Sequence, residues 1–285
     1  MKSLECKILK ITDEQYPAHL RNIPNAPQRL YYIGDLSIIQ KPLYAIVGTR
    51  RASPYGRWAA YEIGKRIAQC GISIVSGMAE GIDTCGHRAC LDSGTPTVAV
   101  LGTGIDVIFP KSNTNLYYEI AENGLILSEY EPGVSGHAYN FPERNRIVSG
   151  LSKAVIVVEG AYKSGSMITA KLALEQGRDV FAVPGNINQP NSTGTNSLIY
   201  DGAGAITDLN ELLPQLGIIG NQLTISLANC SKSELEILRI IKEAPGITVE
   251  ELAVAIYEDI PTVLRLVNTL ELRGLLKSEG AKYFY

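Results

Sequence analysis

The feature that most constrains the fold is an alternation between short apolar runs and amphipathic stretches, which begins at Leu43. The apolar runs are rich in β-branched side chains and are almost continuous. Runs of this kind are typical of strands in a parallel sheet that helices cover on both faces. The predicted strands are Tyr44–Gly48, Ile72–Ser76, Thr97–Leu101, Leu125–Leu127, Ala154–Val158 and Asp179–Val183.

Helical spacing between these runs completes an α/β pattern. Several of the helical stretches end at a glycine, the residue most often found just beyond a helix C-terminus. The alternation predicts a Rossmann-like, doubly wound parallel sheet over residues 43–213, preceded by a short N-terminal lead-in at residues 1–42. The predicted helices are Pro54–Gln69, Ile82–Asp92, Asn113–Glu122, Glu143–Leu151 and Ser166–Gln176.

A second, smaller domain is expected at the C-terminus. Residues 214–230 are weakly periodic and rich in glycine, which predicts a linker. Ser231 and Thr248 each open a possible capping box, and residues 260–273 have amphipathic helical spacing. With a hairpin expected around Glu279 and Gly280, residues 231–285 predict a winged-helix domain. Nine acidic residues against seven basic ones favour protein contact for this domain, with auxiliary DNA binding second.

Composition narrows the classes of protein. The chain has no apolar run long enough to span a membrane, and its first ten residues lack the apolar core of a signal peptide, so we expect a cytoplasmic protein that does not contact membrane. The five cysteines are odd in number and form no C-x-x-C pair, which argues against disulfides and zinc. With a net charge of −3, nucleic-acid binding requires a local cluster of cations.

Small residues gather where the predicted strands end. The carboxyl ends of parallel strands meet at one edge of a sheet, where helix N-termini also converge, so this edge is a candidate site for phosphate groups. For any one glycine the alternative is a tight strand-to-helix turn. The G-x-G-x-x-G fingerprint and the Walker lysine motif are absent, so we expect no cofactor. The residues of the expected site are Gly48, Thr49, Arg50, Gly77, Lys163, Ser164, Gly165 and Ser166.

The most distinctive stretch runs from Phe141 to Ile147. An aromatic ring before a proline, followed by Arg144, Asn145 and Arg146, offers a stacking face for a base and two phosphate donors within one helical turn. The alternative is a capped helix with solvated arginines and a phenylalanine in the core. Because Arg50 and Lys163 are also expected at the strand ends, we favour a polyanion site over this alternative.

Residues for catalysis are few. The three histidines have no metal-ligand spacing, and neither Ser76 nor Ser166 lies in the G-x-S-x-G pattern of a nucleophilic serine. Asp83 and His87 share one helix face, where Asp83 alternatively caps the helix. We therefore expect no catalytic residue and no metal site, and a protein that is not an enzyme.

Taken together and in this order, the motifs resemble those of the DNA-processing protein A (DprA/Smf) family. The resemblance covers residues 16 to 285, and no single motif is specific by itself. The motifs are Gly48–Arg50, Ser76–Thr84, Ala99–Asp106, Phe109–Pro110, Ser128–Tyr130, Phe141–Ile147, Ser164–Ser166, Val183–Gly185, Gly194–Ile199 and Gly202–Ala203.

The resemblance implies a protein of natural transformation that binds single-stranded DNA, protects the incoming strand and loads the recombinase RecA, usually as a homodimer. Carried onto this sequence, it implies a basic rim of Arg50, Arg144, Arg146 and Lys163, with Phe141 on a base. Ala138 stands where the family often has a lysine.

Two other functions are compatible with the sequence. Related Rossmann proteins of the phosphoribohydrolase type process nucleotides and carry P-G-G-x-G-T-x-x-E where this chain has Glu159–Ser166, without the P-G-G core or the later glutamate. Transcriptional regulation through the winged helix is the other alternative, and it predicts binding to a defined duplex.

Overall fold

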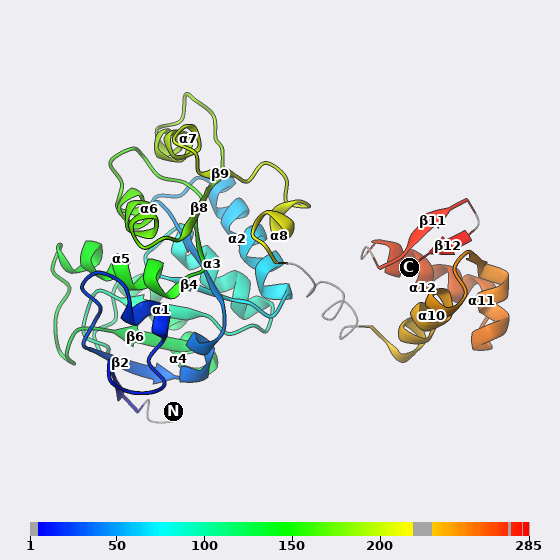
Figure 1. Cartoon of the computed structure of the whole chain (residues 1–285), viewed down its shortest axis with the longest axis horizontal. Coiled ribbons are helices and arrows are strands. Elements are labelled where there is room, and N and C mark those ends of the chain that lie inside the picture. The colour runs from blue at the N-terminus through cyan, green and yellow to red at the C-terminus, as the bar shows by residue number, and fades with distance from the viewer. Residues whose placement is uncertain (1–4, 219–229, 273–274, 281, 285) are drawn as a thin grey trace. The chain divides into compact units, whose positions relative to one another are not determined.

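The computed structural model describes residues 5–218, 230–272, 275–280 and 282–284. The chain divides into two compact units, Met1–Ile218 and Ile219–Tyr285 (Figure 1). Each unit has a hydrophobic core of its own. Among the helices of these described ranges, none has the length and apolar character needed to cross a bilayer.

The described part of the first unit is built on a nine-stranded sheet in the order β1-β2-β6-β5-β4-β3-β7-β8-β9. All neighbours from β6 to β9 in this order are parallel. The chain adds strands on one side of β3 as far as β6 and then returns to add β7 on the other side. This reversal confirms the predicted doubly wound sheet, whose central strands are β3 (Leu43–Val47), β4 (Ser73–Ser76), β5 (Val98–Leu101), β6 (Leu125–Ser128), β7 (Ala154–Val157) and β8 (Asp179–Ala182).

Both faces of the sheet are buried, as the continuous apolar runs predicted. Successive residues of a strand point to opposite faces. Val98 and Val100 of β5 belong to one core cluster, whereas Ala99 and Leu101 belong to the other. Helices of the first unit cover the two faces; they are α1 (Ala18–Arg21), α2 (Pro54–Gln69), α3 (Ile82–Asp92), α4 (Thr114–Asn123), α5 (Asn140–Leu151), α6 (Gly165–Glu175), α7 (Thr193–Tyr200) and α8 (Leu212–Gln215).

The segment that the sequence analysis treated as a lead-in supplies part of this sheet. Strand β2 (Arg29–Gly34) runs antiparallel beside β6, and β1 (Lys7–Lys10) runs antiparallel beside β2. Leu30, Tyr31 and Ile33 of β2 are all buried. At the opposite edge, the two residues of β9 (Gly204–Ala205) pair with β8.

Helix α5 begins at Asn140, three residues before the predicted start. Phe141 and Pro142 therefore lie in the first helical turn. Proline is tolerated there because backbone N–H groups of the first turn have no partner within the helix. Because of this earlier start, Phe141 belongs to the helix rather than to the loop before it.

The second unit has the predicted order of a winged helix. Its helices are α10 (Lys232–Glu243), α11 (Val249–Ile256) and α12 (Ile260–Leu272), and its described strands are β10 (Ile247–Thr248), β11 (Lys277–Glu279) and β12 (Lys282–Phe284), paired in the order β10-β12-β11. Both capping boxes form, at Ser231 with Glu234 and at Thr248 with Glu251.

Only the ends of the expected linker at 214–230 can be described, because residues 219–229 lie outside the described part of the chain. Residues 214–218 are part of the first unit. Leu216 and Ile218 are buried, and the carbonyl of Leu216 accepts a hydrogen bond of 2.9 Å from the hydroxyl of Tyr44 in β3.

Candidate nucleic-acid interface

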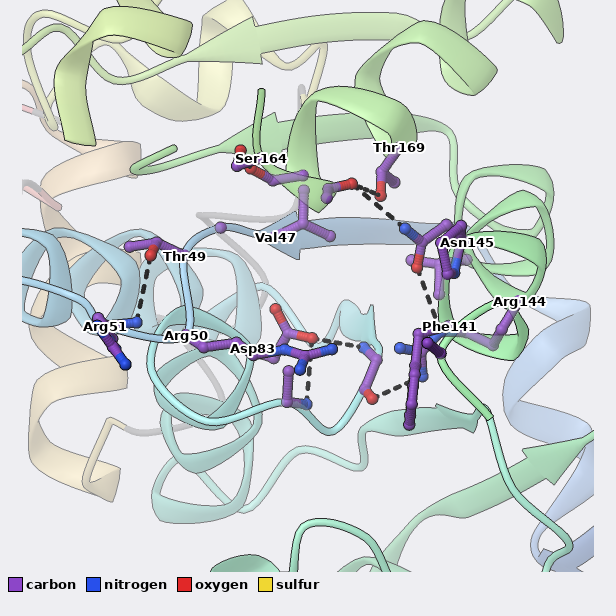
Figure 2. Close-up of a pocket in the computed structure, with 18 residues that line it drawn as sticks. Val47, Thr49, Arg50, Arg51, Asp83, Phe141, Arg144, Asn145, Ser164 and Thr169 are labelled. Atoms are coloured by element: carbon purple, nitrogen blue, oxygen red, sulfur yellow. Dashed lines mark hydrogen bonds between the residues drawn. The ribbon is translucent and has the colours of Figure 1, made fainter. Parts of the chain in front are cut away.

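A cavity of about 420 Å³ opens at the carboxyl ends of the central strands, and we call it cavity 1 (Figure 2). It lies where the direction of strand addition reverses, between β3 and β7, which is the place where doubly wound sheets bind ligands. Most of the residues expected from the sequence line it: Gly48, Thr49, Arg50, Gly77, Phe141, Arg144, Asn145, Ser164, Gly165 and Ser166.

Glycines at the strand ends make room for this arrangement. A Cβ atom on Gly77, directly after β4, would lie 2.6 Å from Nη2 of Arg144 and 2.9 Å from Oδ2 of Asp83. A Cβ atom on Gly102, after β5, would lie 2.7 Å from Cδ1 of Phe141. Both positions exclude a side chain because neighbouring groups of the site already fill the space.

Phe141 and Arg50 enter cavity 1 from opposite sides and meet there (Figure 2). The guanidinium carbon of Arg50 lies 5.3 Å from the centre of the Phe141 ring, which is within the range of a cation–π contact. The ring of Phe109 also packs near that of Phe141, with 5.3 Å between ring centres. Phe141 is half-buried, so one part of its ring is packed and another part lines the cavity.

Arg144 occupies a different position from the exposed one that the sequence suggested. Its side chain is 4% exposed, and its guanidinium donates hydrogen bonds to the carbonyl oxygens of Gly77, at 2.6 Å, and of Val100. Burial lowers the pKa of Arg144 to about 10, while the nearby charge of Asp83 raises it. The guanidinium therefore holds the ends of β4 and β5 together beneath cavity 1.

Asp83 is a buried carboxylate whose charge influences the pKa of this arginine. Its Oδ2 accepts hydrogen bonds from the backbone N–H groups of Gly77 at 3.1 Å and of Ala79 at 3.3 Å. Burial raises the pKa of this carboxyl, and the charge of Arg144 together with the two N–H donors opposes the rise. Both the arginine and the carboxylate are thus engaged within the protein.

Arg146 and Lys163 do not line cavity 1. The guanidinium of Arg146 forms a bidentate contact with Glu129, at 2.7 and 2.8 Å, and donates to the carbonyl of Asn25 at 2.9 Å. Lys163 is exposed on the turn between β7 and α6, directly before the cavity residue Ser164. Of the expected basic residues, Arg50 is the one that is both exposed and inside the cavity.

The N-terminus of α6 forms another wall of cavity 1. Ser164 and Ser166 share a hydrogen bond of 2.7 Å between their hydroxyls, and Asn145 donates to the carbonyl of Gly165 at 3.3 Å. Free N–H groups and the helix dipole make the start of an eleven-residue helix favourable for negative charge. The wall and Arg50 together suit a phosphate group.

Arg51 is a cation of the candidate site that the sequence analysis missed. It is exposed, it lines cavity 1, and its N–H donates to the hydroxyl of Thr49 at 3.2 Å. The sequence signal that could have identified Arg51 was its position directly after Arg50, in the same turn that follows β3. Thr169, which lies one turn into α6, also lines the cavity, and only the folded helix brings it there.

The described histidines and acidic residues form no metal site. No group of three or more His, Cys, Asp or Glu side chains able to hold a metal ion occurs in the described ranges. His87 is fully buried, with Nδ1 at 2.8 Å from the hydroxyl of Thr97, and burial lowers its pKa to about 3. It therefore remains neutral and serves packing.

Comparison with known proteins places these features in a family. Residues 7–217 match the family described as DNA recombination-mediator protein A, and residues 230–280 match the MarR family. The chain is 43% identical over 205 residues to DNA processing protein DprA of Streptococcus pneumoniae, which covers 72% of each protein. It is 46% identical over 212 residues to protein Smf of Synechocystis, which covers 73% of this chain and 53% of that protein. The chain thus spans about half the length of the Synechocystis relative.

Two solved structures are similar to the first unit. The structure of DNA processing protein A from Streptococcus pneumoniae has a TM-score of 0.71 at 41% identity and covers 75% of each chain. A structure reported for the single-stranded DNA binding mode of DNA processing protein A from Helicobacter pylori has a TM-score of 0.69 at 34% identity, covering 75% of this chain and 96% of that chain. With the family match over residues 7–217, these similarities show that the chain belongs to the DNA recombination-mediator protein A family.

Proposed function

We propose that this protein binds single-stranded DNA in cavity 1. The observation that carries the proposal is the contact between Arg50 and Phe141 at the carboxyl edge of the sheet, which offers a cation and an aromatic face to one nucleotide. The Helicobacter pylori relative, whose structure was reported for its single-stranded DNA binding mode, supports the same ligand for this chain.

Each residue of cavity 1 has a role in this proposal. Arg50 and Arg51 contact phosphate together with the N-terminus of α6, where Ser164 and Ser166 add hydroxyl donors. Room for the sugar-phosphate backbone comes from lining residues with a small side chain or none, which are Gly48, Thr49, Gly77 and Gly165. Asn145 is held beside them by its hydrogen bond to Gly165. The part of Phe141 that faces the cavity stacks on a base. Arg144 positions the strand ends from below, Lys163 attracts the strand from outside, and Arg146 supports α5 through Glu129.

Membership of the family supports a cellular role that we also propose. The protein protects single strands that enter during natural transformation and delivers them to the recombinase RecA in the cytoplasm, acting as a homodimer. On strands already coated with a single-strand binding protein, adding this protein should shorten the delay before RecA-driven strand exchange. An unchanged delay would contradict delivery to RecA without affecting the proposed binding.

We propose that the protein binds the strand without catalysing a reaction on it. Asp83 is the single carboxylate among the described residues that line cavity 1, and it already accepts two backbone N–H groups and faces Arg144. A phosphoribohydrolase needs a free acid beside the ribose. Incubation with nucleoside monophosphates, followed by chromatography for released base, tests this: release of base would establish the enzyme instead.

The proposed ligand is tested by titrating the 285-residue chain against fluorescein-labelled oligo-dT and a duplex of the same length. We expect anisotropy to rise with the single strand at protein concentrations that leave the duplex free. Stronger binding to the duplex would contradict the proposal and favour regulation through the winged helix.

A further inference from the structure

A second cavity opens at the same edge of the sheet and is not used by the proposed function. It has a volume of about 700 Å³, and we call it cavity 2. One wall is the start of α2, and the other is the segment between β8 and α7. Its lining residues are Ser53, Pro54, Tyr55, Glu159, Pro184, Gly185, Asn186, Gln189, Asn191 and Ser192.

Cavity 2 is the direct continuation of cavity 1 along the chain. Thr49, Arg50 and Arg51 line the first cavity, and Ser53 to Tyr55 line the second. Two residues of chain span at most about 7 Å, so Arg51 and Ser53 stand close together. The amide of Asn191 donates a hydrogen bond of 3.0 Å to the carbonyl of Arg51, which fixes a wall of cavity 2 to the loop of cavity 1.

The chemistry of cavity 2 suits a base rather than a phosphate. None of its described lining residues is a lysine or an arginine, and the carboxylate of Glu159, 5% exposed, carries the one formal charge. That carboxylate accepts from the N–H of Ser53 at 2.9 Å and from its hydroxyl, which fixes the start of α2. A phosphate placed here would meet negative charge without a compensating cation.

Neutral groups that recognise bases are present instead. Asn186 and Gln189 are exposed carboxamides that line the cavity, and carboxamides pair with the polar edges of bases. Tyr55 is 48% exposed, and its hydroxyl contacts the carbonyl of Pro184 at 3.3 Å, so the ring is held at the mouth of the cavity. An exposed, fixed aromatic ring is a stacking face for a base of any sequence.

We propose that cavity 2 is a second nucleotide subsite, which takes the base of a nucleotide next to the one bound in cavity 1. This inference rests on the proposed binding of single-stranded DNA. The strand crosses the loop of Arg50 and Arg51, which hold its phosphates, and places successive bases against Phe141 and Tyr55.

The chain contains an internal probe of this subsite. Trp58 is its one tryptophan; it is 53% exposed on α2, and its ring centre lies 6.0 Å from that of Tyr55. A base that stacks on Tyr55 changes the surroundings of Trp58. Binding of a ten-nucleotide oligo-dT should therefore change the tryptophan emission of the 285-residue chain.

Two substitutions test the subsite: one removes its aromatic ring, and the other removes one of its carboxamides. Tyr55→Ala should weaken decamer binding by about 5- to 150-fold, the range measured for loss of one stacked base. Gln189→Ala changes an exposed loop residue with no effect expected on folding, and it should also weaken binding and reduce the emission change. Tyr118→Ala is the matched control, because Tyr118 is 40% exposed on α4 and lines neither cavity; it should bind as the wild type does.

The outcomes separate this inference from the proposed function. The subsite would be overturned if the wild type bound the decamer with unchanged Trp58 emission and if Tyr55→Ala and Gln189→Ala kept wild-type affinity. That result would leave the proposed binding in cavity 1 unaffected. A wild-type protein that binds no single strand at low salt would overturn the function itself. Weaker binding in both variants, with the salt dependence of the wild type retained, is the result expected for contacts to a base.

Discussion

Arg50 lies over the ring of Phe141, with its guanidinium carbon 5.3 Å from the ring centre, although 91 positions separate the two residues in the sequence. The contact joins the loop after β3 to the first turn of α5 across cavity 1. The contact places the guanidinium charge, which attracts phosphate, beside the aromatic ring that we assign to a base. The predictions below separate the part of each group in binding from its part in folding.

Arg50→Ala should weaken binding of single-stranded DNA without lowering the melting temperature, because the side chain is exposed. Each phosphate contact removed should reduce the slope of log K against log salt by about 0.7 for single strands. Lys163→Ala should act in the same direction. The matched control is Lys171→Ala, an exposed cation of α6 outside cavity 1. Unchanged slopes in the first two variants would show that neither Arg50 nor Lys163 contacts a phosphate.

Phe141→Ala should lower affinity for single strands by about 1–3 kcal/mol and leave the salt slope unchanged. Its ring also packs against Gly102 and Phe109, so some loss of stability is expected. The loss should be smaller than the about 3–5 kcal/mol typical of a fully buried ring, because Phe141 is half-buried. Phe109→Ala is the control, since Phe109 does not line the cavity. If Phe141→Ala destabilises the fold while the folded fraction binds normally, the ring is a core residue only.

Arg144→Met should destabilise the fold, because it leaves the carbonyls of Gly77 and Val100 without their donor and removes a positive charge that acts on the buried carboxylate of Asp83. Leaving a buried polar group unsatisfied costs about 1–3 kcal/mol. Adding Asp83→Asn should recover part of this loss, since the neutral amide still accepts from the N–H groups of Gly77 and Ala79. Urea unfolding of the single and double variants measures both effects. Wild-type stability combined with lost DNA binding would make Arg144 a direct contact instead.

Burial of His87 should make stability depend on pH. Its pKa falls from 6.5 to about 3 because the folded protein keeps the ring from water, so protonation favours the unfolded chain. The stability that this group contributes is complete above pH 6.5 and decreases as the pH falls toward 3. Between pH 7 and 5 the wild type should lose about 2 kcal/mol from this residue.

Urea unfolding at the two pH values checks the contribution of His87. His87→Asn should show a smaller loss between pH 7 and 5 than the wild type, whatever its stability at pH 7. His137→Asn, which changes an exposed ring, should keep the pH dependence of the wild type. Equal losses in the wild type and in His87→Asn would show that His87 is not the titrating group.

The central strands could be predicted because their signal is local. A strand buried on both faces, such as Ala154–Val157, consists of apolar residues whatever its neighbours are. Strand β2 was missed because its pairing with β6 depends on residues almost a hundred positions away, and β1 was missed because it pairs with β2 at the edge of the sheet. The four residues of β1 include two lysines and show three exposed positions, so the strand has almost no apolar signal of its own.

The candidate site was predictable as far as topology determines it. Gly48, Gly77 and Ser164 meet because parallel strands end at one edge of a sheet. The sequence could not separate Arg50 from Arg144, since both stand beside small or polar residues. Burial separates them: the carbonyls of Gly77 and Val100 accept from Arg144, and these acceptors are arranged only when β4 and β5 lie side by side.

Binding of a base in cavity 1 is tested by photocrosslinking of the wild-type chain to an oligonucleotide that carries 5-iodouracil, followed by mass spectrometry of the crosslinked peptides. Aromatic side chains that stack on the modified base react preferentially. Our account predicts that the main crosslink lies at Phe141 and that Arg50→Ala reduces its yield. A main crosslink in residues 230–284 of the second unit, with Phe141 unmodified, would contradict binding in cavity 1.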